Sequence, residues 1–225
     1  MREQIIFREF EESDRLALEQ IIRETWYYDR FCTPKTAAQL ASIYLSSCLA
    51  NQTFTQVALV DGVPVGIIMG KNRTTHKCPF SLRLKMIKSI VKLLISKEGR
   101  KVSKIFGCVD GIDRELLSLC PTHYQGELAF FAIRQNCRGK GIGKILFQKV
   151  VAYMHSQKIH NFYLFTDTSC NYGFYEHQGM KRQQEKKHRF HVNGMPEEMT
   201  FFLYDYNCSL NIQPPKPTHK AVSLK

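Results

Sequence analysis

A glycine-rich segment constrains this chain more than any other feature of its sequence. It reads Arg138-Gly139-Lys140-Gly141-Ile142-Gly143-Lys144 and lies between a short apolar run, residues 127–135, and a segment with apolar residues at helical spacing, residues 139–157. The apolar run is typical of a strand that is buried on both faces. Alternate glycines let the backbone approach a ligand closely, and the free N–H groups of a first helical turn attract anions. We therefore predict a phosphate-binding turn between a strand and a helix of an α/β fold.

The two common nucleotide-binding motifs do not fit this turn. A dinucleotide fingerprint needs glycine at the sixth position, where Lys144 stands when the count begins at Gly139. A Walker motif needs Ser or Thr after Gly143-Lys144, and the next residue is Ile145. The sequence therefore favours a different phosphate ligand.

The rest of the chain alternates strand and helix patterns. We expect an α/β domain with a mixed sheet over residues 1–206, with a helical insert at about 72–125, and a disordered Pro-rich tail over 207–225. Apolar spacing at Leu16, Leu18, Ile21 and Ile22 predicts the first helix. The expected strands are 5–8, 54–60, 63–71, 127–135, 162–166 and a final hairpin through Asn193-Gly194 into 199–206; the remaining helices are 34–49, 82–95, a piece near 113–119, 139–157 and 171–178.

Charge and cysteine content exclude several classes of protein. The net charge of +12 is concentrated in residues 73–104, which hold ten basic residues and one acid, so a nucleic-acid-coating surface is not favoured. The eight cysteines form no C-x-x-C pair and the eight histidines no metal-binding motif, so we expect no metal. The sequence contains no run of about twenty apolar residues. Its first residues do not resemble a signal peptide, so we expect a cytoplasmic protein.

Two segments resemble motifs of the GNAT superfamily of acyl-CoA N-acyltransferases. The turn at 138–143 is similar to the Gln/Arg-x-x-Gly-x-Gly/Ala signature of that family, and Phe131-x-Ile133 to the apolar strand end before it. Residues 171–180, NYGFYEHQGM, resemble a later segment of the family that contains Asn and Tyr. This resemblance implies a mixed sheet in which the parallel strands 4 and 5 splay apart, with flanking helices and a helical insertion between strands 3 and 4.

The resemblance also implies roles for individual residues. Acetyl-CoA would bind with its pyrophosphate on residues 138–144 and its pantetheine arm along Phe131, Ala132 and Ile133. Asn171 and Tyr175 would lie beside the thioester. The chain departs from the family pattern at Gln135, where a proline is common, and in the long insertion between strands 3 and 4.

Acyl transfer to an amine needs a base and an acid. Glu127, which opens the apolar strand, is the candidate base, although it could simply begin a strand in solvent. Tyr175 is the candidate acid for the departing thiolate, although it could be a packing aromatic. Asn171 could bind the cofactor, cap a helix, or do both. Cys137 lacks a nearby catalytic partner in the sequence, and we interpret it as structural.

The preferred function is an N-acetyltransferase that moves an acetyl group directly from acetyl-CoA to a primary amine. The alternative is a non-catalytic CoA-binding protein that docks an acidic partner through its basic insert. The acceptor is a small molecule or a peptide, an anionic acceptor being one option, and the oligomeric state stays open, a homodimer included.

The insert carries an amphipathic pattern that allows several interpretations. Apolar residues at helical spacing predict a buried stripe, and lysines mark another face, which could be a solvated surface or could attract an anionic acceptor. Membrane association is not favoured, because the stripe has no aromatic beyond Phe80. The stripe is Leu84, Ile87, Ile90, Val91, Leu94 and Ile95, and the lysines are Lys85, Lys88 and Lys92.

Overall fold

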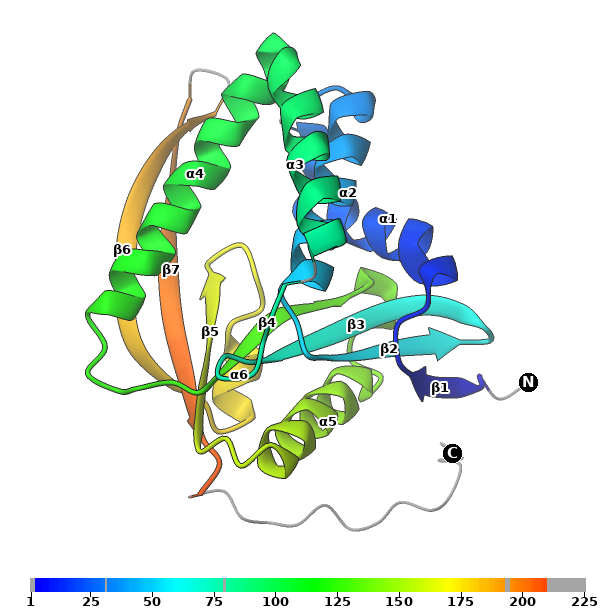
Figure 1. Cartoon of the computed structure of the whole chain (residues 1–225), viewed down its shortest axis with the longest axis vertical. Helices are drawn as coiled ribbons and strands as arrows, with labels where there is room; N and C mark the ends of the chain where they lie inside the picture. Colours follow the sequence, from blue (N-terminus) through cyan, green and yellow to red (C-terminus); the bar gives the residue numbers. More distant parts are fainter. Residues whose placement is uncertain (1–2, 31, 79, 193–194, 210–225) are drawn as a thin grey trace.

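A seven-stranded mixed sheet organises the chain. The computed structural model describes residues 3–30, 32–78, 80–192 and 195–209. Its strands lie in the order β1-β2-β3-β4-β5-β7-β6 (Figure 1). Neighbouring strands are antiparallel except β4 and β5, which are parallel. The α/β fold with a mixed sheet and a helical insertion between the third and fourth strands is confirmed.

The elements follow the predicted order along the chain. The strands are β1 (Ile5–Arg8), β2 (Phe54–Val60), β3 (Val63–Asn72), β4 (Gly126–Ile133), β5 (Asn161–Asp167), β6 (Lys181–Val192) and β7 (Met195–Asn207). The helices are α1 (Arg15–Thr25), α2 (Pro34–Ala50), α3 (Phe80–Ile95), α4 (Lys97–Ser118), α5 (Ile142–Ser156) and α6 (Gly173–His177).

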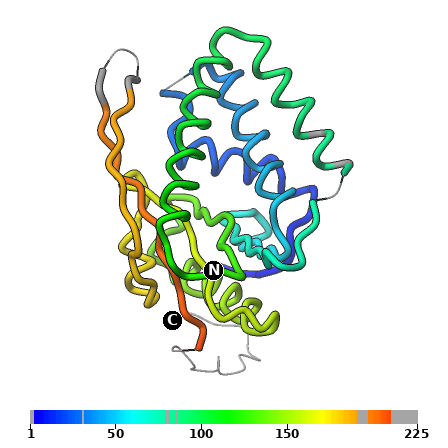
Figure 2. The backbone as a smooth tube through the Cα atoms, turned by 60° about the vertical axis from the view of Figure 1, so that its left-hand side comes forward, coloured from blue at the N-terminus to red at the C-terminus, as the bar shows by residue number. Residues whose placement is uncertain are grey.

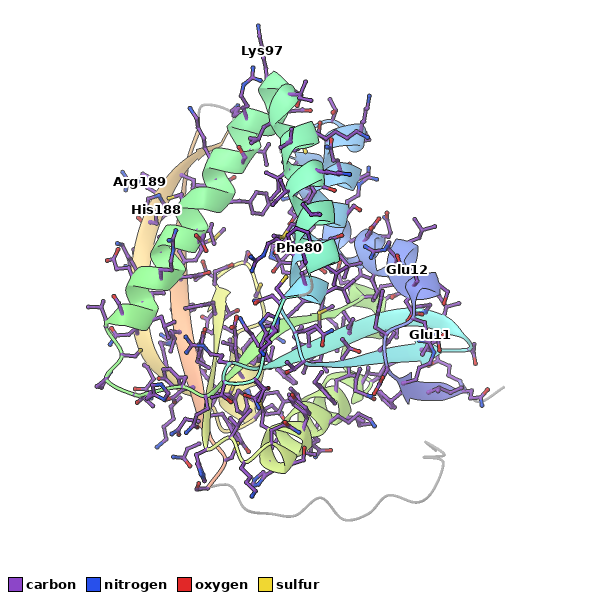
Figure 3. All side chains as sticks on the ribbon, in the orientation of Figure 1. Glu11, Glu12, Phe80, Lys97, His188 and Arg189 are labelled. Carbon is purple, nitrogen blue, oxygen red and sulfur yellow. The ribbon has the colours of Figure 1, made fainter. Side chains whose placement is uncertain are left out.

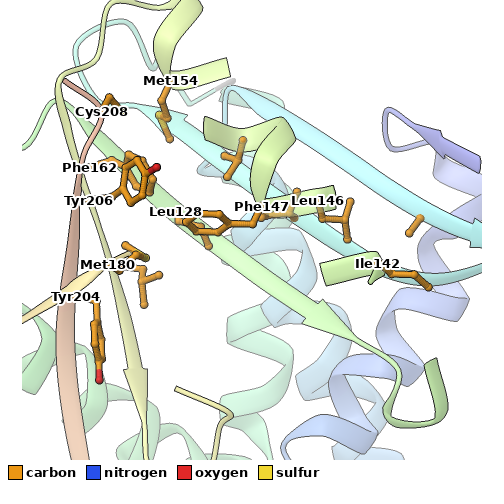
Figure 4. Close-up of a cluster of buried hydrophobic side chains, with 14 of the residues drawn as sticks. Leu128, Ile142, Leu146, Phe147, Met154, Phe162, Met180, Tyr204, Tyr206 and Cys208 are labelled. Carbon is orange, nitrogen blue, oxygen red and sulfur yellow. The ribbon is translucent and has the colours of Figure 1, made fainter. Parts of the chain in front are cut away.

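Alternate residues of the central strands enter two separate cores. Ala58 and Ile68 pack with α5 on one face of the sheet, whereas Val57 and Ile67 pack with α1 and α2 on the other. Figure 4 shows the core on the α5 side. Its labelled members are Leu128, Ile142, Leu146, Phe147, Met154, Phe162, Met180, Tyr204, Tyr206 and Cys208.

A bulge in β4 divides its side chains between these two cores. The pairing with β3 passes from Phe130 to Leu128 and leaves Ala129 without a partner residue. Leu128 consequently packs on the α5 side, while Phe130 and Ala132 pack on the side of α1 and α2. The predicted burial of this strand on both faces is confirmed, and the bulge explains how it is achieved.

The insert consists of two helices, and the full length of the second was not predicted from the sequence. The break falls at Ser96, whose hydroxyl accepts the Gly99 N–H at 2.8 Å, and α4 then continues without interruption to Ser118. The predicted helix over 82–95 is therefore confirmed as α3, whereas the predicted piece near 113–119 is the last part of the longer α4. Gly99 lies in the first turn of α4. A side chain does not fit at this position, because a Cβ would lie 2.0 Å from the Leu93 carbonyl oxygen.

Several predicted boundaries also shift. Helix α5 begins at Ile142, because Gly139 and Gly141 both have a positive φ that a helix cannot contain. Strand β4 ends at Ile133, and Gln135 opens a single 3₁₀ turn. In α1, Leu16 is 80% exposed and lies outside the buried stripe. Asn207 ends β7, and both the Asn193-Gly194 turn and residues 210–225 of the expected tail lie outside the described residues.

The outward stripe of α3 is exposed, where the sequence predicted burial. Helix α3 has apolar residues on two faces, and only the face with the buried Leu93 packs against its neighbours. Of the predicted stripe, Ile90 is half-buried, whereas Leu84, Ile87, Val91, Leu94 and Ile95 are exposed. Among the described residues, no helix is long and apolar enough to cross a membrane.

Candidate active site

The parallel strands β4 and β5 separate soon after they begin. They pair only at Gly126 with Phe162 and at Glu127 with Tyr163. Beyond this point β5 pairs with β7, while β4 continues along β3 to Ile133. Residues 128–133 of β4 therefore have one edge that no described strand covers, and we call this the open edge.

The backbone register indicates which peptide groups face outward from the open edge. The Arg134 N–H donates to the Val65 carbonyl at 2.8 Å, so the peptide groups of Arg134 point toward β3. Peptide groups alternate along a strand, so those of Ala132 also point toward β3, whereas those of Phe131 and Ile133 point into the opening. An extended ligand could therefore hydrogen-bond to Phe131 and Ile133 as an additional strand would.

The glycine turn follows the open edge and precedes α5. Gly139 and Gly141 adopt φ of +80° and +79°, which glycine tolerates without the steric penalty of a side chain. The first backbone hydrogen bond of the helix runs from the Ile145 N–H to the Gly141 carbonyl at 3.2 Å. Within the described part of the chain, the N–H groups of residues 139–144 have no acceptor, and this arrangement is typical of an anion site at a helix N-terminus.

Gly143 brings the glycine turn against the open edge. A Cβ at Gly143 would lie 3.1 Å from Ile133 Cδ1 and 3.5 Å from Phe131 Cζ, so the start of α5 lies in close contact with the side chains of the open edge. The Phe131 ring also packs on Phe174 of α6, with ring centroids 5.5 Å apart. Strand β4, the start of α5 and α6 therefore meet at one place.

The three basic side chains of the glycine turn differ in their interactions. Arg138 Nε donates to the Ile133 carbonyl at 3.1 Å, which occupies one acceptor of the open edge. Lys140 Nζ contacts both carboxylate oxygens of Glu3 at 2.8 and 2.9 Å, and this hydrogen bond raises the pKa of Lys140. Lys144 is exposed and has no ion pair among the described residues. Lys144 is therefore the cation most available to a ligand, and Ile142 is buried and offers only its backbone N–H.

Tyr175 lies next to the open edge. Its ring centroid is 6.4 Å from that of Phe131, 5.6 Å from Phe174 and 6.3 Å from Tyr204. Burial, followed by the nearby Cys170 and Asp167, raises the pKa of Tyr175. The phenol therefore keeps its proton at neutral pH, as a general acid must, and no described residue accepts a hydrogen bond from it.

Asn171 does not cap α6 with its side chain. The helix begins at Gly173, and the Asn171 backbone carbonyl, not its amide, accepts the Phe174 N–H at 3.2 Å. The Asn171 side chain is exposed beside this turn and is free for another role. Cys137 is buried in the core on the α5 side, in line with a structural role.

Glu127 lies at the last paired rung before the strands separate. It is 17% exposed, and its Oε2 lies 3.7 Å from Lys71 Nζ. Its neighbour across the rung is Tyr163, whose pKa is raised by burial and also by Glu127. The carboxylate is therefore enclosed at the closed end of the opening and does not begin a strand in solvent.

Sequence reasoning missed Asp113 on α4. Burial, then the nearby carboxylates of Asp110, Asp167 and Glu127, raises the pKa of Asp113 to about 7. Through Asp113 the insert therefore contributes a carboxyl group to the environment of Glu127, while Asp167 of β5 acts on both Asp113 and Tyr175. A signal was present, since Asp113 shares a helix face with Val109 and Leu116, and an acid on an apolar stripe is unusual.

A protein-family model matches the part of the chain that contains this site. The model of the acetyltransferase (GNAT) family matches residues 15–180, well over half of the chain. The chain belongs to the GNAT acetyltransferase family. The open edge, the glycine turn and α6 all include residues within this match.

Solved structures share the GNAT fold at low sequence identity. A Streptococcus mutans protein aligns with a TM-score of 0.54 and 14% identity over 90% of this chain and 99% of its own. A ribosomal-protein-alanine N-acetyltransferase from Brucella melitensis gives 0.53 and 14% over 90% and 99%. An N-acetyltransferase from Staphylococcus aureus gives 0.52 and 12% over 91% and 98%. These similarities establish the fold alone, and no curated protein matches the sequence.

Proposed function

We propose that this GNAT protein transfers an acetyl group directly from acetyl-CoA to a primary amine. The observation that carries the proposal is the continuity of the open edge with the glycine turn, held together by the close approach of Gly143 to Phe131 and Ile133. A ligand with an extended amide-containing arm and a pyrophosphate would find backbone partners along both. The donors fit, because residues 139–144 present unpaired N–H groups and Lys144 adds an unpaired positive charge.

The catalytic step needs groups on both sides of the thioester carbon. The amine nitrogen forms a bond to the carbonyl carbon, the carbon–sulfur bond breaks, and the amine loses one proton. We assign that proton to Glu127, directly or through water, and we assign protonation of the departing thiolate to Tyr175. A backbone N–H of the open edge would stabilise the oxyanion. Asn171 remains a proposed cofactor contact beside Tyr175.

The charges around the opening bear on the choice of acceptor. Asp113, Asp167 and Glu127 act on one another electrostatically, whereas Lys88 and Lys92 are exposed on α3. We therefore expect an amine with an additional positive charge to be preferred over the anionic acceptor that the basic insert suggested.

All eight cysteines are free, which supports a reducing compartment, and we place the activity in the cytoplasm.

The test is a thiol-release assay with acetyl-CoA and a panel of amines: a polyamine, a lysine-containing peptide, a neutral amino sugar and glutamate. Release that depends on an amine supports the transferase, and a polyamine or peptide should exceed glutamate. Calorimetric binding of coenzyme A with no amine-dependent release would instead support the non-catalytic CoA-binding protein. If the wild-type protein neither bound coenzyme A nor released thiol, the assignment of the glycine turn as a phosphate site would be contradicted.

A further inference from the structure

Helix α3 carries an apolar ridge that no element of the described residues covers. Six side chains at helical spacing point away from α2, and Phe80 and Ile95 at its two ends are 72% and 74% exposed. We call this ridge the α3 outer face. Figure 2 shows α3 along the outer edge of the molecule, with α2 on its inner side. The α3 outer face consists of Phe80, Leu84, Ile87, Val91, Leu94 and Ile95.

Positive charge surrounds the α3 outer face. Arg83, Lys88 and Lys92 are exposed on the same helix, and no carboxylate of the described residues pairs with them. Residues 73–104 contain a single acid, Glu98, which is already occupied by hydrogen bonds from Thr33 and Thr36. Figure 3 shows Phe80 near one end of α3 and Lys97 projecting beyond the other. An exposed apolar ridge bordered by unpaired cations is an unusual surface for a protein in water.

We propose that the α3 outer face binds the surface of a membrane that contains anionic lipids, with α3 parallel to that surface. The ridge spans 16 residues, about 24 Å of helix, and is convex, so it can enter the boundary between headgroups and acyl chains while the flanking cations meet lipid phosphates. The sequence disfavoured a membrane because the stripe has no aromatic residue beyond Phe80, and it separately predicted that the stripe is buried. The stripe is exposed, and that aromatic residue, Phe80, belongs to it.

The charge pattern favours this occupant over a second copy of the chain. Two copies that met through this ridge would bring their unpaired cations together around a shared apolar seam, and like charges repel. An anionic lipid surface supplies the opposite charge along the whole ridge. The α3 outer face contains no residue of the glycine turn or the open edge, and the proposal does not depend on the proposed acetyl transfer.

Vesicle flotation with the full chain tests the proposal. The probes are vesicles of phosphatidylcholine alone and of equal parts phosphatidylcholine and phosphatidylglycerol. We expect wild type to float with the anionic vesicles only. Each lysine near an anionic surface contributes about a five-fold gain in affinity, so Lys88→Gln/Lys92→Gln should bind about 25-fold more weakly at low salt. Ile87→Ser/Val91→Ser should lose binding, since it removes the centre of the ridge.

Matched variants separate the ridge from general effects of charge and hydrophobicity. Leu16→Ser removes an apolar side chain that is 80% exposed on α1, more than Ile87 or Val91, and Lys181→Gln/Lys187→Gln removes two exposed lysines from β6. Both should bind vesicles as wild type does. Phe80→Trp should shift its fluorescence to shorter wavelength on anionic vesicles, because the ring enters an apolar environment.

Three results would overturn the proposal. The first is that wild type fails to float with anionic vesicles. The second is that Ile87→Ser/Val91→Ser binds them as wild type does, which would indicate attraction by charge alone. The third is that wild type is a dimer in size-exclusion chromatography and that this double variant is monomeric, which would assign the ridge to a second copy.

Discussion

Replacing Gly141 by aspartate tests whether the glycine turn holds a phosphate. A Cβ at this position would meet no other atom within 4 Å, so the new side chain clashes with nothing. The cost to folding is confined to the left-handed backbone conformation, about 1 kcal/mol for a residue other than glycine. We therefore expect a folded protein whose free energy of unfolding is lowered by about 1 kcal/mol.

The expected loss of binding follows from the added charge. Two unit charges about 4 Å apart repel by about 1 kcal/mol in water and by about 4 kcal/mol at the effective dielectric constant near a protein surface. For each phosphate charge beside Gly141, this corresponds to a rise in Kd for coenzyme A of about 5-fold to nearly 1,000-fold. Isothermal titration calorimetry covers this range.

Two further variants separate charge from shape. Gly141→Asn has almost the same side chain without the charge. Gly62→Asp places the same charge at the β2–β3 turn, where φ is also +79° and a Cβ also meets no atom within 4 Å. The gap in Kd between Gly141→Asp and Gly141→Asn should shrink toward 1 M salt, where the Debye length is about 3 Å. Gly62→Asp should bind as wild type does with a similar loss of stability. If Gly141→Asp bound coenzyme A with wild-type affinity, the turn would not be the phosphate site.

The remaining predictions concern the opening between β4 and β5. Tyr175→Phe should keep coenzyme A affinity and lower turnover by about 10²–10⁴-fold, with Tyr172→Phe as the control; equal turnover of both would remove Tyr175 as the acid. Glu127→Gln should reduce the rate most below the pKa of the amine, and an unchanged pH–rate profile would remove Glu127 as the base. Because burial and neighbouring carboxylates raise the pKa of Asp113 to about 7, the folded protein keeps a proton that the unfolded chain releases from about pH 4 upward. The protonated carboxyl group of Asp113 therefore adds to the free energy of unfolding at low pH. As the pH rises through 7, the free energy of unfolding falls by up to about 4 kcal/mol. Asp113→Asn should flatten that dependence in chemical denaturation at pH 5 and pH 8, and parallel curves would contradict the burial of this carboxyl group.

The sequence was sufficient for the element order and the glycine turn, because both depend on local patterns. Apolar runs mark the strands, and glycines with positive φ mark the turn wherever it lies in space. The exposure of α3 could not be predicted this way. Its two faces are both apolar, and periodicity alone cannot tell which of them packs against α2.

The environment of Asp113 and the bulge at Ala129 depend on contacts between distant segments. The pKa of Asp113 on α4 is raised first by burial and then by the carboxylates of the local Asp110, Asp167 on β5 and Glu127 on β4. The bulge arises where β4 must supply side chains to two different cores while it pairs with β3. Neither the raised pKa of Asp113 nor the bulge at Ala129 can be predicted from a short stretch of sequence. The candidate acid and base could nonetheless be proposed from the sequence, because Tyr175 and Glu127 lie within or beside the motifs that carry the family resemblance, and their roles stay predictions.

The insert contains a cationic region and a separate region of carboxylates around Asp113. Its net positive charge alone does not reveal this separation. The cations that begin α4, such as Lys97, are about 24 Å along the helix axis from Asp113, since sixteen residues separate them at about 1.5 Å per residue. At physiological salt, charges in solvent are screened within about 8 Å, so these cations act weakly on an acceptor beside Asp113. We therefore expect the carboxylates near the opening to decide which acceptor charge is favoured there. In the proposal above, the basic segment instead interacts with anionic lipids through the α3 outer face.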